Sequence, residues 1–149
     1  MRCEATDRQR AIFLKTLTYT EMSELETFED RYRYLKLGGA VGRATFGHDR
    51  YINQNFYRSP QWRHLRSHII MRDDGCDLGV PGYDLHQRIY IHHMNPMTVE
   101  DLISGSPDVL DPEFLICVSH RTHNAIHYGD ESLLPSPPVE RQPGDTKLW

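Results

Sequence analysis

The chain has 149 residues, of which 38% are hydrophobic and 26% charged, proportions typical of one folded domain rather than a disordered chain. No apolar stretch approaches the roughly 18 residues that a membrane-spanning helix needs, so we expect no membrane association and a cytoplasmic location. The three cysteines are widely spaced and form no Cys-x-x-Cys pair, which excludes a four-cysteine zinc knuckle and is unlike a disulfide framework.

Charge is distributed unevenly along the chain. The net charge is −4, but residues 31–72 contain nine Lys or Arg and a single acid, Asp49, and so carry +8. The segments on either side, residues 1–30 and 73–149, carry −3 and −9. A basic segment in an acidic chain is typical of a protein that binds a polyanion with one face. The alternative is a solvated, charged surface without a partner.

The N-terminal half is predicted to be mainly helical. Residues 1–22 show no clear period and are expected to be an extension. Four apolar positions then follow a helical spacing: Leu25, Phe28, Tyr32 and Leu35. Two starts remain open for this region. A capping box formed by Ser23 and Glu26 would begin one helix, whereas a start at Thr27 with Asp30 in the first turn would divide it into two short helices. Gly38 and Gly39 are expected to end it.

The next two segments combine basic and aromatic residues. Residues 38–60 hold four glycines among arginines and aromatic rings, so we expect loops with short helical pieces. The rings either grip a nucleic-acid backbone together with the arginines or anchor loops on the core. Pro60 predicts a helix over residues 60–73, because proline is favoured in a first helical turn. Its apolar stripe consists of four residues: Trp62, Leu65, Ile69 and Ile70.

The C-terminal half alternates strands and helices. We expect strands over residues 87–92 and 114–118, separated by a short capped helix over 98–103 and a polar connection over 105–112. Ser119 is a typical N-cap for a helix over 120–128, and Gly129 is a typical end. Residues 131–149 are rich in proline and are predicted to form an extended tail.

Four histidines lie at the end of the first strand and on the last helix: His92, His93, His123 and His127. His123 and His127 are four apart and share one helical face, so both can bind one ion. Successive side chains of a strand point to opposite faces, so only one of His92 and His93 should join them. The other, with an ordinary pKa of about 6.5, is suited to act as a general base beside the open coordination position.

This histidine pattern resembles that of the HNH nucleases of the His-Me-finger (ββα-metal) class, and most closely the colicin-type DNases, whose motif also begins with two adjacent histidines. The similarity covers residues 87–129. Residues 28–35, 53–57 and 75–79 are also similar to segments of small phage and prophage HNH endonucleases. The resemblance implies an α+β fold with one nuclease domain over residues 23–130, in which a helical, basic part over 23–74 precedes a ββα-metal core over 87–129.

The resemblance also implies a chemistry for the four histidines. His92, His123 and His127 would hold one divalent metal ion, and His93 would be the base in the hydrolysis of DNA phosphodiester bonds. Zinc is the expected ion, with Mg, Mn or Ni as alternatives that support activity. Five further side chains are candidates for DNA contacts, or else plain surface residues: Arg88, His120, Arg121, Arg63 and Arg66.

One position departs from the family. Phe114 stands where the family has an asparagine that ties the loop behind the catalytic histidine, with Glu113 or Asn95 as candidate substitutes. This departure supports a second hypothesis, a non-catalytic zinc-containing protein that binds DNA or assists DNA packaging. The likeness to phage proteins also implies phage packaging (terminase) proteins as partners and, for a phage-encoded chain, the cytoplasm of a bacterial host as the location. A toxin-like nuclease domain is a third and weaker alternative.

Overall fold

The computed structural model describes residues 16–37, 50–140 and 142–144. Within them the chain combines helices with one two-stranded antiparallel sheet, so the predicted α+β class is confirmed. The helices and strands are α2 (Tyr19–Ser23), α3 (Phe28–Leu35), α4 (Arg50–Arg58), α5 (Pro60–Arg72), β1 (Tyr90–His93), α6 (Val99–Ser104), β2 (Leu115–Val118) and α7 (His120–Tyr128). Four short 3-10 turns are η2 (Asp77–Gly79), η3 (Pro107–Leu110), η4 (Pro112–Phe114) and η5 (Glu131–Leu133). None of the helices in the described ranges has the length and apolar character to cross a bilayer.

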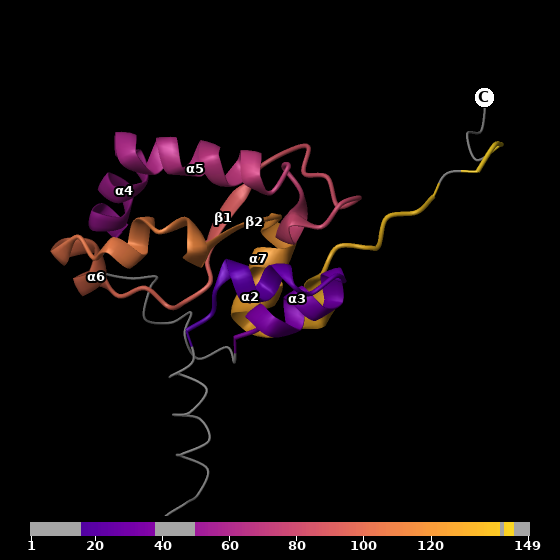
Figure 1. Cartoon of the computed structure of the whole chain (residues 1–149), viewed down its shortest axis with the longest axis horizontal. Coiled ribbons are helices and arrows are strands. Elements are labelled where there is room, and N and C mark those ends of the chain that lie inside the picture. The colour runs from indigo at the N-terminus through magenta and orange to yellow at the C-terminus, as the bar shows by residue number, and fades with distance from the viewer. Residues whose placement is uncertain (1–15, 38–49, 141, 145–149) are drawn as a thin grey trace, which may run out of the picture.

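The hairpin of β1 and β2 lies between two groups of helices (Figure 1). Side chains alternate between its faces, so Ile91 and Cys117 pack in a cluster with α5, whereas Ile116 and Val118 pack in a cluster with α3 and α7. Ile91 pairs with Cys117 in the register, and His92 pairs with Ile116. The two core clusters therefore lie on opposite faces of the hairpin, and neighbouring residues of one strand belong to different environments.

The helices before the basic segment follow the later of the two predicted starts. The Thr27 side chain accepts a hydrogen bond from Asp30 N and caps α3, while Ser23 ends α2. The Ser23–Glu26 capping box is therefore wrong, and the start at Thr27 is confirmed; the region after Ser23 forms one helix, α3, rather than two. Met22 is fully buried in the core, so the segment expected as an extension packs on the domain from Leu17 onward.

In the basic segment, α5 begins and ends close to where the sequence predicts. Ser59 caps it, Pro60 is its first residue, and Trp62 and Ile69 are its buried positions. Residues 50–58, where we expected loops with short helical pieces, form the nine-residue helix α4. Residues 38–49 of that stretch, with Gly38 and Gly39, lie outside the described residues.

The strands are shorter than predicted. Arg88 has a φ of +50°, a left-handed conformation that a strand residue cannot adopt, so β1 begins only at Tyr90. Phe114 belongs to η4, and β2 begins one residue later. The capped helix α6 is confirmed, with a capping box between Thr98 and Asp101. After η5 the tail passes the loop around Gly82 and leaves the body of the domain (Figure 1).

Three arginines of the basic segment hold the fold together. Arg31 donates hydrogen bonds to the carbonyl oxygens of Leu25 and Leu78, at 2.8 and 2.7 Å. Arg72 donates to the carbonyl oxygens of Pro112 and Leu115, at 2.7 and 2.6 Å.

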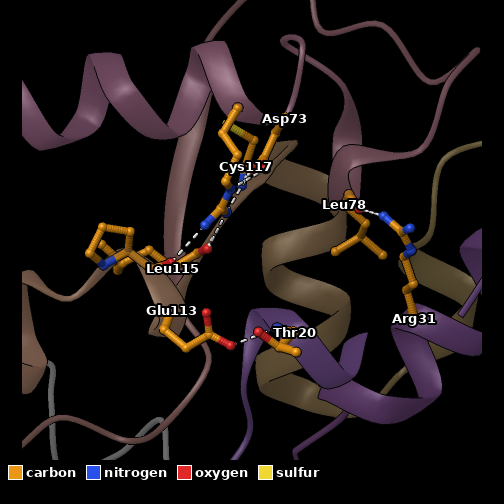
Figure 2. A network of polar contacts seen from close by, with 9 residues as sticks. Thr20, Arg31, Asp73, Leu78, Glu113, Leu115 and Cys117 are labelled. Carbon is orange, nitrogen blue, oxygen red and sulfur yellow. Dashed lines mark hydrogen bonds and ion pairs between the residues drawn. The ribbon is translucent and has the colours of Figure 1, made fainter. Parts of the chain in front are cut away.

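Arg66 donates to the Ile89 carbonyl oxygen at 2.9 Å. The carboxylate of Asp73, buried beside Arg72, accepts a hydrogen bond from Cys117 N at 2.8 Å (Figure 2). Part of the +8 charge read from the sequence therefore satisfies buried carbonyl groups rather than facing a polyanion.

Candidate metal centre and the adjacent histidine

The start of α7 is fixed by a buried carboxylate. Ser119 caps the helix, and its backbone N–H donates to Asp77 Oδ1 at 3.1 Å. Thr122 Oγ1 donates to Asp77 Oδ2 at 2.6 Å. Burial raises the pKa of Asp77, while these hydrogen bonds oppose that rise. No local pattern in the sequence assigns this role to Asp77, although the residue lies within the 75–79 segment that carries part of the family likeness.

His92, His123 and His127 come together between β1 and α7. One ring nitrogen from each lies within 4.8 Å of the others. The Nε2 atoms of His123 and His127 are 3.1 Å apart, and the His92 ring meets both rings edge-on at centroid distances of 5.6 and 5.1 Å. These are the three ligands named from the sequence, and the fold places them in one group.

The donor set suits a divalent metal ion. His92 Nε2 and His127 Nδ1 are buried and have no hydrogen-bond partner within the described part of the chain. An unpaired buried polar atom is costly, and a bound ion would satisfy His92 Nε2. Two nitrogens on one tetrahedral zinc ion lie about 3.3 Å apart when each bond is about 2.0 Å. The 3.1 Å separation between the His123 and His127 nitrogens is close to that value.

All three imidazoles are held in the neutral form that metal binding requires. Burial lowers the pKa of His92 well below its ordinary value, and the neighbouring His127 and His123 lower it further. Burial and His127 lower the pKa of His123 to about 4, and burial also lowers that of His127. The site is therefore uncharged at neutral pH.

His93 faces the other side of the hairpin. It ends β1 opposite Leu115, and its ring stacks on the indole of Trp62 at 5.5 Å with an interplanar angle of 15°. Its Nε2 lies 3.1 Å from the carbonyl oxygen of Val109. Because a carbonyl oxygen only accepts hydrogen bonds, Nε2 carries the proton and Nδ1 has the free lone pair. Burial lowers the pKa of His93 to about 4, so the ring is neutral.

The residues around the missing asparagine do not support the His93 ring. The Phe114 carbonyl oxygen accepts from Met94 N at 2.9 Å, which extends the hairpin by one hydrogen bond. Glu113 accepts from Thr20 N at 2.7 Å (Figure 2).

Asn95 forms two hydrogen bonds with the backbone of Leu17, at 2.8 and 2.9 Å. Both candidate substitutes therefore tie residues 17–20 to the hairpin. Val109 and Trp62 contact His93 instead, and sequence analysis missed both in this role.

Two of the candidate DNA contacts lie on α7, the helix that carries His123 and His127. The exposed His120 ring lies 5.4 Å from that of Tyr90, which in turn stacks on His123 at 5.7 Å. Arg121 is exposed on the same helix, and its Nε donates to the Leu133 carbonyl oxygen at 3.3 Å. Tyr90, which sequence analysis did not single out, therefore borders the histidine group.

The other three candidates lie on α5 or just before β1. Arg88 is exposed just before β1, and Arg63 is exposed on α5. Arg66, also on α5, is half-buried and bonded to Ile89. The structure thus places Arg63 and Arg66 on the helix that carries Trp62, rather than beside the three histidines.

Comparison with known proteins adds no relative. No family model, curated protein or solved structure matches the chain. The likeness to the HNH family therefore stays a prediction drawn from the histidine pattern, and the proposals below depend on the geometry.

Proposed function

We propose that the chain is a metal-dependent HNH endonuclease, with a ββα-metal core formed by β1, β2 and α7, that hydrolyses DNA phosphodiester bonds. The observation that carries the proposal is the group of three neutral imidazoles, His92, His123 and His127, with the neutral His93 adjacent on the same strand. Within the described residues the group has three members, whereas structural zinc sites use four protein ligands. The open position favours a catalytic ion.

The metal would be held by the three histidines, with zinc as the expected ion and Mg, Mn or Ni as alternatives that support activity. A bound divalent ion would neutralise the charge that develops on the scissile phosphate and on the leaving oxygen. The chain supplies the neutral donors and excludes water from His92, which is 2% exposed.

His93 would take the proton from the attacking water. Its Nδ1 has the free lone pair, because Nε2 donates to Val109. His93 is also the last residue of β1, so its ring lies at the end of the hairpin.

Phosphate positioning would come from exposed basic side chains. Arg88, His120, Arg121 and Arg63 are exposed, whereas the bond from Arg66 to Ile89 leaves it less available. Such contacts add affinity without sequence choice.

The second candidate is a non-catalytic, zinc-containing DNA-binding or DNA-packaging protein, with packaging (terminase) proteins as partners. One observation favours it: the His93 ring faces Trp62 and α5 rather than the three-histidine group. In that case a metal would bind, but His93 would be dispensable for the activity of the protein.

Nicking of supercoiled plasmid DNA tests the first candidate. With the protein at saturating zinc, nickel, magnesium or manganese, the wild type should cleave, and His93→Ala should be slower by about 100-fold or more, because a general base contributes about 10²–10⁴-fold. His64→Ala, which replaces an exposed histidine of α5, is the matched control and should cleave like the wild type. Cleavage by His93→Ala at the wild-type rate would contradict the base assignment. Absence of wild-type cleavage with all four metals, together with tight zinc binding, would favour the second candidate.

A further inference from the structure

We propose that Trp62 is the positioning residue for His93 and, with the Val109 carbonyl, takes the place of the asparagine that Phe114 replaces. The inference rests on the proposed nuclease function. It deepens that function by assigning the support of the base to helices α4 and α5, which precede the proposed ββα-metal core in the chain. Trp62 lies 31 positions before His93 in the sequence and is 5% exposed.

The two contacts of the His93 ring restrict different motions. The nearly parallel indole, at 15°, restricts tilting of the imidazole out of its plane. The hydrogen bond from Nε2 to the Val109 carbonyl oxygen, at 3.1 Å, restricts rotation within the plane. Together they orient Nδ1, whereas either contact alone leaves one rotation free.

The Trp62 ring is itself held firmly. The centroids of the Phe56 and Tyr57 rings lie 5.2 and 5.1 Å from the centroid of the Trp62 ring. The backbone N–H of Trp62 donates a hydrogen bond to Ser59 Oγ at 3.2 Å. These contacts fix the first turn of α5 and the last turns of α4. The aromatic residues of the basic segment therefore serve, at this point, to build a platform for His93.

The helix that carries Trp62 is attached to both strands. Arg66 binds the Ile89 carbonyl just before β1, and Arg72 binds the Leu115 carbonyl of β2. Leu115 is also the residue paired with His93. The platform and the histidine are thus tied to the same hairpin.

Trp62→Leu removes the planar surface, and Trp62→Phe keeps a smaller one. The matched control is Phe28→Leu, which breaks another buried aromatic stack, Phe28 on Tyr83 at 4.3 Å and 5°, in the other core cluster. All three variants lose packing, but only the Trp62 variants change the contact of His93.

Steady-state nicking kinetics and zinc titrations of the full chain provide one test. For Trp62→Leu we expect kcat to fall by about 10-fold to 100-fold, because misplacing a catalytic group by about 1 Å costs that much. KM and the zinc Kd should stay within about twofold. The three ligands lie on the other face of β1, and a misplaced base weakens stabilisation of the transition state rather than binding of the substrate. Trp62→Phe should recover most of the rate. If Trp62→Leu and Phe28→Leu lose kcat equally, the positioning role is overturned.

The imidazole NMR signals of His93, assigned with His93→Gln in metal-free protein, test the placement without any activity. Stacking on indole should shift them upfield in the wild type, and Trp62→Leu should remove that shift while Phe28→Leu keeps it. Unchanged signals in Trp62→Leu would overturn the proposal. If the wild type does not cut DNA, the nuclease assignment fails, yet these signals still decide whether Trp62 holds His93.

Discussion

At the scale of single residues, the two adjacent histidines of β1 have different surroundings because the strand is regular through its last residue. His92 points toward α7, and its buried Nε2 has no hydrogen-bond partner among the residues that the structure describes. His93 points toward α5, where the Trp62 ring and the Val109 carbonyl contact it. Residue type alone does not distinguish them; the two-residue period of a strand does.

This difference predicts how metal binding responds to each histidine. His92→Ala should weaken zinc binding by more than about 100-fold, because even loss of an outer partner of a ligand costs about 10–100-fold. His93→Ala should leave zinc binding within about threefold, since the His93 ring faces Trp62 and α5, on the opposite side of the strand from the three ligands. Isothermal titration with zinc, and the visible absorption of the cobalt-substituted protein, would measure both. Equal losses in the two variants would contradict the assignment of His92 as the ligand.

At the scale of elements, α7 depends on contacts at both ends. Asp77 holds its first turn, and Gly129 ends it with a φ of +64°. On its buried side, the Tyr32 hydroxyl donates to the Ala125 carbonyl oxygen at 3.1 Å, and Leu37 N donates to the Ile126 carbonyl oxygen at 3.0 Å. These contacts fix the helix that presents His123 and His127.

Gly129 and Gly105 offer a matched pair for testing the end of this helix. A Cβ on Gly129 would lie 2.6 Å from the Leu37 carbonyl oxygen, whereas a Cβ on Gly105 would meet nothing within 4 Å. Both residues have φ values above +60°. Gly105→Ala should therefore lower the free energy of unfolding by about 1–2 kcal/mol, the cost of a left-handed alanine. Gly129→Ala should lower it further, because Leu37 must also move.

Urea denaturation followed by circular dichroism would measure both losses. Equal losses in the two variants would show that the Leu37 backbone moves aside at no cost in free energy. That result would contradict the close contact between Gly129 and the Leu37 carbonyl oxygen.

At the scale of the whole molecule, two strands of four residues each are stable only because both faces of the hairpin are covered. The hydrogen bonds of Arg72, Asp73 and Arg66 tie α5 to one face of the hairpin. The core cluster that contains Ala125 and Ile126 of α7 covers the other face. Within the described residues the hairpin is thus held by packing on both faces together with these hydrogen bonds. As a result, neutral histidines are packed in the interior on both sides of the sheet.

The buried histidines predict a pH-dependent stability of the metal-free protein. The pKa values of His93 and His123 are about 4 in the folded state, against about 6.5 in an unfolded chain. The unfolded state therefore takes up protons first as the pH falls below about 6.5, so stability present at pH 7 is lost progressively toward pH 4. Each of the two should contribute up to about 2 kcal/mol of this loss by pH 5.

Urea unfolding in the presence of a chelator, at pH 7, 6 and 5, would measure the loss. His93→Gln should show a shallower dependence than the wild type, because the residue that titrates in the unfolded state is gone. A wild-type free energy of unfolding that is constant from pH 7 to pH 5 would contradict the buried, neutral state of these rings.

The sequence by itself determined the features that depend on neighbours within a few positions. The helix over α5, the Ser119 cap, the end at Gly129 and the shared face of His123 and His127 are all of this kind. Their signals are local, because caps, turns and helical periodicity act over about four residues. The same locality explains why the sequence left two starts open for α3, since both capping patterns were present.

Only the tertiary structure decided what each histidine contacts. The Val109 carbonyl lies 16 positions from His93, and Asp77 lies 45 from Thr122. Neither is distinguished by residue type, because any residue offers a carbonyl and any aspartate a carboxylate. Trp62 was predicted to be an apolar helix residue, and it is one, but its position against His93 follows from how α5 packs on the hairpin. Contacts between distant segments depend on the packing of whole elements, which no local pattern of residues specifies.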